Sequence, residues 1–138
     1  MQRDHKWLKN RLEQIWKTYF SDVKIANNIL VKFGRRSMTR LGSIKHGRLQ
    51  ENRNTIITIN GYFQDPEIPE FVVDAVLAHE LTHYAHGFFH PDGPKQRYPH
   101  KGGAVKKEMV DRGLQNLLKL EKKWIKENWR IYIKKHHF

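Results

Sequence analysis

The sequence predicts an α+β fold in a single domain that spans residues 1–138. Helical periodicity of apolar residues appears near both ends of the chain and again in its middle. Three short runs rich in β-branched residues lie between residues 29 and 60. A chain of 138 residues is long enough to bury one modest core. We therefore expect an N-terminal helix, a three-stranded sheet, a central helix and a long C-terminal helix.

The first helix is predicted over residues 4–20. Its apolar residues fall on one stripe, and its lysines lie elsewhere on the helix; the stripe consists of Trp7, Leu8, Leu12, Ile15, Trp16, Tyr19 and Phe20. In a compact chain this stripe is expected to face the core, although a membrane-surface helix has the same pattern.

Three strands are predicted at Ile29–Phe33, Arg40–Ile44 and Thr55–Asn60. The links between them contain turn-forming residues, among them Gly34. Such close spacing predicts an antiparallel meander, in which each strand pairs with the next one along the chain.

The central helix is predicted between Pro69 and Gly87, and it contains the run His-Glu-Leu-Thr-His. Residues i and i+4 lie on the same face of a helix, so His79 and His83 can offer two imidazole nitrogens to one metal ion, with Glu80 beside them. This is the H-E-x-x-H pattern of zinc peptidases, which a chain of this composition would contain by chance only about 0.03 times.

The long C-terminal helix is predicted from Ala104 to Lys135, after a loop rich in glycine and proline over residues 88–103. Its apolar face consists of Val105, Met109, Val110, Leu114, Leu117, Leu118, Trp124 and Ile125. Gly113 marks a place where this helix can bend.

The net charge of +12 is unevenly spread along the chain. Residues 32–53 hold seven basic residues and one acidic residue, whereas residues 61–92 hold six acidic residues and no Lys or Arg. A chain that is basic overall and has one more acidic segment, residues 61–92, predicts a polyanionic partner, and nucleic acid is the first candidate. The alternative is a basic surface that serves only solubility.

Composition also excludes several classes of protein. The chain has no cysteine, which excludes disulfides, zinc ribbons and thiol nucleophiles. No apolar run reaches 18 residues, and the first residues form no apolar signal core. We expect a soluble cytoplasmic protein, which can also associate with the nucleoid.

A catalytic zinc ion usually takes three protein ligands, and three residues after the motif are candidates for the third. Glu108 lies 25 residues after His83 on the next predicted helix, as in gluzincin-like sites. His100 lies 17 residues after His83, at the start of that helix. His90 is one residue out of register with the longer pattern H-E-x-x-H-x-x-G-x-x-H.

Five short motifs follow one another between residues 40 and 109: Arg40-Leu-Gly-Ser-Ile44, Ile57-Thr-Ile-Asn60, Ile68-Pro69, His79–His83 and His100-Lys-Gly-Gly-Ala-Val105. In this order they resemble the SprT-like metallopeptidase domain, the family that contains the Spartan proteases, over about half of the chain. Lys101 stands where that family has Gly after the third His. Ala104 or Val105 stands where it has an aromatic residue.

The resemblance implies a zincin-like minimal metallopeptidase fold and a zinc endopeptidase that acts on DNA-bound or DNA-crosslinked proteins, as in DNA–protein crosslink repair. It implies one catalytic Zn²⁺ held by His79, His83 and His100. Glu80 would take a proton from the zinc-bound water that attacks the peptide carbonyl. The partners would be a protein or peptide substrate and single-stranded or disrupted DNA.

Further residues complete the predicted site. Tyr98 is the candidate oxyanion stabiliser. The candidate nucleic-acid-binding residues are Arg35, Arg36, Arg40, Lys45 and Arg48. The substrate would join the edge of the sheet over residues 40–60 as an added strand.

Two other functions remain open. One is a small gluzincin-like peptidase without a nucleic-acid role, in which Glu108 is the third ligand. The other is a non-catalytic zinc-containing DNA-binding module. The presence of Glu80 argues against the module, because a structural zinc site needs no general base.

Overall fold

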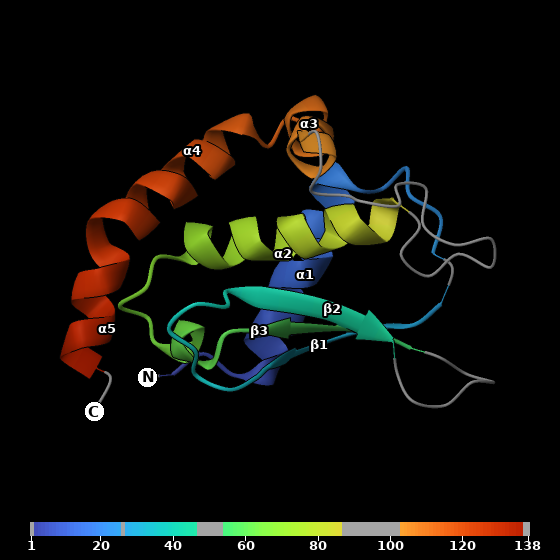
Figure 1. The fold of residues 1–138 in the computed structure, drawn as a ribbon. Coiled ribbons are helices and arrows are strands. Elements are labelled where there is room, and N and C mark those ends of the chain that lie inside the picture. Colours follow the sequence, from blue (N-terminus) through green and yellow to red (C-terminus); the bar gives the residue numbers. More distant parts are fainter. Residues whose placement is uncertain (1, 26, 47–53, 87–102, 137–138) are drawn as a thin grey trace.

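The computed structural model describes residues 2–25, 27–46, 54–86 and 103–136 (Figure 1). The expected α+β architecture is confirmed. In chain order the elements are α1 (His5–Tyr19), β1 (Ile29–Phe33), β2 (Gly42–His46), β3 (Thr55–Ile59), a 3-10 turn (Gly61–Gln64), α2 (Glu70–Ala85), α3 (Ala104–Asp111), α4 (Gln115–Trp124), a π-helical turn (Ile125–Trp129) and α5 (Arg130–His136).

The N-terminal helix α1 begins one residue later than predicted, because Asp4 is its N-cap. The Asp4 carboxylate accepts a hydrogen bond from the backbone N–H of Trp7 at 2.8 Å. Leu8, Leu12 and Ile15 are buried, so the apolar stripe faces the core as expected. Among the described residues, no helix is long and apolar enough to cross a membrane.

The sheet is mixed and has the order β1-β3-β2, so the predicted antiparallel meander is wrong. The central strand β3 pairs with β1 in parallel and with β2 in antiparallel fashion. Its residues are alternately buried and half-buried, as suits a strand with a neighbour on each side.

The chain reaches the far side of β3 because the segment 34–41 passes over the end of that strand. Gly34 donates its backbone N–H to the carbonyl of Ile59 at 2.8 Å, and Gly61 donates to the carbonyl of Arg35 at 3.0 Å. A Cβ at Gly61 would lie 2.5 Å from the carbonyl oxygen of Gly34, so the crossing requires a glycine there. Sequence-adjacent pairing of β1 with β2 is thereby excluded.

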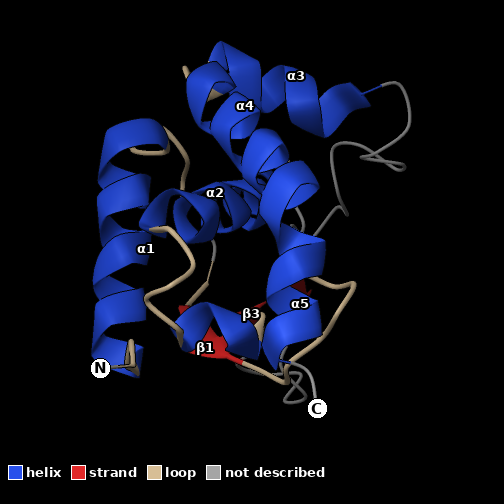
Figure 2. Ribbon diagram, turned by 90° about the vertical axis from the view of Figure 1, so that its left-hand side faces the viewer, coloured by secondary structure: helices blue, strands red, loops and turns tan. Residues whose placement is uncertain are grey.

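The central helix α2 packs against the sheet on one side and against α3 and α4 on the other (Figures 1 and 2). Helix α1 covers it from a third direction. Twelve of its 16 residues are buried, as expected for a helix that is apolar on nearly every side. The motif helix is therefore at the centre of the core.

The prediction of one continuous C-terminal helix over residues 104–135 is wrong at Gly113, where the structure has a helix end. Helix α3 ends at a left-handed turn, in which Gly113 has a φ of 84°. Gly113 donates its N–H to the carbonyl of Val110 at 3.0 Å, and Leu114 donates to that of Met109 at 2.9 Å. This pair of hydrogen bonds is a Schellman cap, which stops a helix completely. The chain then restarts in a new direction as α4, the π-helical turn and α5 (Figure 1).

Candidate metal centre

Helix α2 places His79 and His83 on successive turns of one face, as their spacing predicts. Their Nε2 atoms lie 3.3 Å apart, and the two rings are in edge contact with centroids 4.9 Å apart. Both side chains are half-buried. Two imidazole nitrogens at this separation can bind the same metal ion.

Glu80 lies beside them and is 5% exposed. Its Oε2 atom is buried and accepts no hydrogen bond from any described residue. Burial raises the pKa of Glu80 to about 7, an effect that the positive charge of Arg40 partly opposes. A buried, unsatisfied carboxylate is costly for a fold, so it indicates a functional group.

The ligand-forming atoms of His79, Glu80 and His83 all lie within 4.8 Å of one another. Two imidazoles and one carboxylate are a donor set that suits zinc among the common divalent cations. The unsatisfied oxygen of Glu80 also fits a cation or a water held there. His79 and His83 therefore fit a metal ion with Glu80 beside it, and the ion would need at least one further ligand from another part of the chain.

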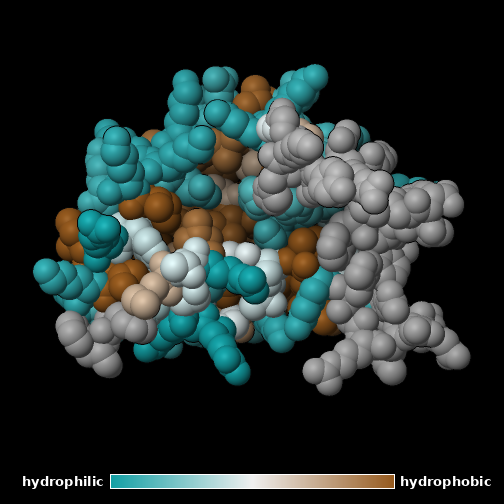
Figure 3. All heavy atoms as spheres, viewed as in Figure 1, coloured by the Kyte–Doolittle hydropathy of each residue, from teal (hydrophilic) through white to brown (hydrophobic). Residues whose placement is uncertain are grey.

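A groove runs past these three side chains, with residues 39–45 as its other wall. It consists of two cavities that share Arg40, Gly42 and Glu80, one of about 480 Å³ on the His79 side and one of about 490 Å³ on the His83 side. In Figure 3 apolar side chains are visible in the recess between α4 and β2, below a hydrophilic rim.

The wall of the groove is strand β2, which lies at one edge of the sheet. Gly42 brings this strand close to α2, because a Cβ at that position would lie 2.7 Å from Cγ1 of Val76. The segment before β2 is held by Asn60, whose Nδ2 donates to the carbonyls of Ser37 at 2.6 Å and Arg40 at 2.8 Å. The edge strand β2 is thus fixed beside the face of α2 that carries His79 and His83.

The predicted third ligand His100 and the predicted oxyanion stabiliser Tyr98 lie outside the described residues, as do His90 and Arg48. Their roles stay predictions.

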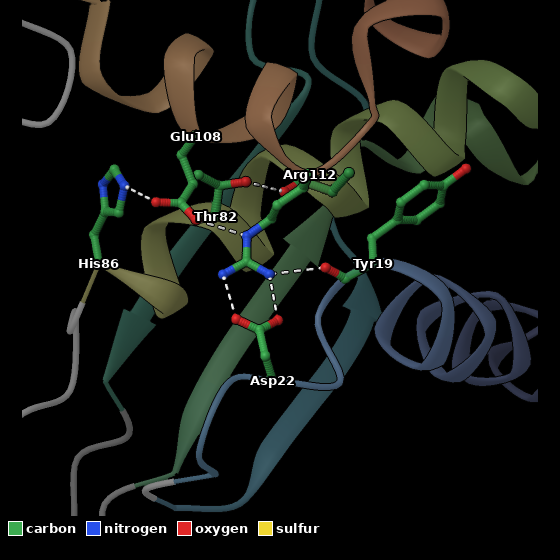
Figure 4. Close-up of polar contacts among 7 residues, drawn as sticks. Tyr19, Asp22, Thr82, His86, Glu108 and Arg112 are labelled. Carbon is green, nitrogen blue, oxygen red and sulfur yellow. Dashed lines mark hydrogen bonds and ion pairs between the residues drawn. The ribbon is translucent and has the colours of Figure 1, made fainter.

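Glu108, the alternative third ligand, is described and has other partners (Figure 4). Its Oε1 lies 3.1 Å from Nε2 of His86, and its Oε2 accepts from Nε of Arg112 at 2.7 Å. Arg112 also donates to Asp22 at 2.7 Å and to the backbone carbonyl of Tyr19 at 2.8 Å. Glu108 therefore belongs to a network that joins α3 to the ends of α1 and α2.

Four of the five predicted nucleic-acid-binding residues are described, and all four are exposed: Arg35, Arg36, Arg40 and Lys45. Arg40 and Lys45 line the groove together with Glu80. Arg35 lines a neighbouring cavity of about 460 Å³, and the Arg36 guanidinium lies 5.7 Å from the ring of Tyr62. The positive charges therefore lie in the groove and beside it, on the segment before β2 and on β2 itself.

Sequence reasoning missed Glu121, a half-buried residue of α4 that lines the His79 side of the groove. Burial raises the pKa of Glu121 to about 7, against the effect of Lys122. A signal was available, because Glu121 stands in the middle of the apolar face of its helix. The neighbours one turn away on that face are Leu117, Leu118, Trp124 and Ile125, all packed against the core.

No protein-family model matches this chain, and no curated protein or solved structure is significantly similar to it.

Proposed function

We propose that this chain is a zinc-dependent endopeptidase with a zincin-like fold. The observation that carries the proposal is the buried, unsatisfied Oε2 of Glu80 next to two imidazole nitrogens that lie 3.3 Å apart. A merely structural metal site would gain nothing from an acid in this position. In this proposal His79 and His83 hold zinc together with His100, the ligand expected from the sequence.

When bound, the zinc ion would supply Lewis-acid chemistry by polarising the peptide carbonyl and acidifying water. Glu80 is the proton carrier of the reaction. It accepts a proton from the water that attacks the carbonyl and returns it to the amine that leaves. Burial favours the protonated carboxyl and Arg40 favours the ionised one, so the site supports both forms that the two steps require. Arg40 keeps the ionised form of Glu80 accessible.

The peptide substrate binds along the groove as an extra strand beside β2. An edge strand offers unpaired backbone N–H and C=O groups, and these recognise an extended peptide whatever its sequence. Two cavities extend along β2 on either side of Glu80, and this extended shape supports the binding of a peptide strand. An extended, unfolded segment fits such a groove, whereas a folded domain does not.

The substrates in this proposal are proteins bound or crosslinked to DNA. The net charge of +12 and the exposed Arg35, Arg36 and Lys45 near the groove support contact with phosphates. A peptidase without a nucleic-acid role is the second candidate. Arg40 favours this second candidate, because its positive charge acts on Glu80. At least this basic residue then has a role in the site that requires no nucleic acid.

The test compares zinc-loaded wild type with Glu80→Gln on a denatured DNA-binding protein, with and without single-stranded DNA. Glu127→Gln is the matched control, because Glu127 is an exposed acid on the last helical run. Cleavage by wild type and control, faster with DNA, supports the full proposal. Cleavage that DNA does not change leaves the plain peptidase. If neither wild type nor control cleaves the substrate, the enzyme proposal is overturned.

A further inference from the structure

Glu121 is a half-buried acid on the apolar face of α4. Among the described residues it has no hydrogen-bond or ion-pair partner. Glu108, an acid on the preceding helix, by contrast contacts His86 and Arg112. Burying an unpaired carboxylate costs free energy. If this position served only to fill space on the apolar face of α4, an apolar residue would stabilise the fold better than Glu121 does.

Glu121 lies beside the candidate metal site. It lines the 480 Å³ cavity with His79 and Glu80, and it also lines a cavity of about 270 Å³ with His79 and Met109. It comes from α4, which packs on α2 from the side opposite the sheet. Among the described residues it is not part of the group whose ligand-forming atoms lie within 4.8 Å of one another, so it lines the groove next to the candidate ligands.

The charged residues around Glu121 differ between the two cavities. Lys106 and Lys122 line the 270 Å³ cavity with Glu121, and Lys122 is the cation that acts on its carboxyl. The charged residues that line the 480 Å³ cavity are Arg40, Glu80 and Glu121, counted among the described residues. Arg40 acts on Glu80 there, so on the groove side a cation of the substrate can approach Glu121.

We propose that Glu121 is the specificity-determining residue of the groove, and that its carboxylate binds a cationic nitrogen of the substrate next to the metal site. Charge-assisted hydrogen bonds to an ammonium or guanidinium group are the strongest that a carboxylate makes. The nitrogen belongs either to a Lys or Arg side chain or to the α-ammonium group of a chain end. The inference rests on the proposed function and names the residues that the peptidase selects. Proteins that bind DNA present such cations to phosphates, which agrees with the proposed substrates.

The experiment measures binding separately from cleavage. Fluorescent peptides with a central Lys, a neutral isostere or Glu, each with a free or an acetylated N-terminus, are titrated into zinc-loaded Glu80→Gln protein and followed by anisotropy. The Lys peptide is expected to bind about tenfold more tightly than the neutral one or better. Adding Glu121→Gln abolishes this difference, Glu121→Lys reverses it in favour of the Glu peptide, and Glu127→Gln leaves it unchanged. If the tighter binding follows the free N-terminus whatever the central residue, the α-ammonium group is the source. If the Lys peptide keeps its advantage when both N-termini are acetylated, the side chain is the source.

Equal binding of all the peptides, whatever their central residue and N-terminus, or a preference for either cation that survives Glu121→Gln, overturns the inference. Cleavage of the same peptides by protein with Glu80 intact separates the two proposals. Hydrolysis without any preference for cations overturns the role of Glu121 and leaves the peptidase proposal standing. Absence of hydrolysis overturns the peptidase proposal, and the anisotropy series then decides on Glu121 alone.

Discussion

Arg11 on α1 and Asp74 on α2 form a two-point ion pair, with Nε to Oδ1 at 2.9 Å and Nη2 to Oδ2 at 2.6 Å. Asp74 is 9% exposed, so the pair joins the two helices at the border of the core. Arg11→Met should lower the free energy of unfolding by about 2 kcal/mol, because it leaves a nearly buried carboxylate without its partner. Urea unfolding measures this. Lys9→Met, at an exposed position of the same helix, should change stability by less than about 0.5 kcal/mol.

Metal binding and catalysis should separate within the motif. His83→Ala should weaken zinc binding by more than about 100-fold, because it removes a proposed ligand. Removing only a residue that hydrogen-bonds to a ligand typically costs roughly 10- to 100-fold. Glu80→Gln should keep the zinc and lower the hydrolysis rate by about 10²- to 10⁴-fold, because it removes only the proton carrier. Calorimetric zinc titration gives the first quantity and a peptide cleavage assay the second. Loss of zinc in Glu80→Gln would make Glu80 a ligand and contradict its assigned role.

The third ligand can be identified by comparing two variants. His100→Ala should abolish tight zinc binding, as the sequence predicts. Glu108→Ala should retain the zinc and lose stability instead, because Glu108 connects His86 to Arg112. Zinc titration and thermal unfolding on both proteins check this. The opposite pattern, with zinc lost from Glu108→Ala and kept by His100→Ala, would return Glu108 to the metal site.

Acid sensitivity should depend on Asp65. Partial burial opposes ionisation of this carboxyl, but hydrogen bonds from the backbone of Glu67 and from the hydroxyl of Tyr132 at 2.7 Å hold its pKa below its ordinary value. A pKa lower in the folded state than in the unfolded state gives stability that is complete above the unfolded pKa, about 3.9, and is lost as pH falls through the folded one. Tyr132→Phe should therefore lose less stability than wild type between pH 6 and pH 3. Urea unfolding at both values is the measurement, and equal losses would assign the acid response to other carboxyls.

The width of the groove should depend on contact between Gly42 and Val76. Gly42→Ala places a Cβ 2.7 Å from Cγ1 of Val76, so it should cost about 1–3 kcal/mol of stability and reduce cleavage. Val76→Ala removes that methyl group. The double variant should regain cleavage relative to Gly42→Ala, even though Val76→Ala alone leaves a small cavity. Cleavage that the second substitution does not restore would show that the strand moves for another reason.

The local elements of this fold could be predicted from the sequence, because their signals are local. Asp4 caps the first helix, and the spacing of His79 and His83 requires a helix whatever surrounds it. The bend at Gly113 was also visible in the sequence, although its Schellman geometry makes it a complete stop.

Strand order and the far wall of the groove could not be predicted, because both depend on contacts between distant residues. The partner of β1 is decided by a close approach between Gly34 and Gly61, residues 27 positions apart. Glu121 becomes part of the groove only because of the direction in which α4 leaves Gly113. In the sequence it is one acid among the lysines of a helix, and only its position on the apolar face sets it apart.

The helix stop at Gly113 also determines how far the C-terminal helices extend from the core. A straight helix over residues 104–135 would be about 48 Å long and would project beyond a domain of this size. Instead the chain folds back, and Trp129 holds the last helical run in place by donating its indole N–H to the carbonyl of Met38 at 2.8 Å and by edge contacts with the rings of Tyr62 and Phe63. The last helical run is thus held against the segment before β2, while α4 packs on α2. A chain shortened after Gly113 would lose Glu121 from the groove and would expose the face of α2 that α4 covers.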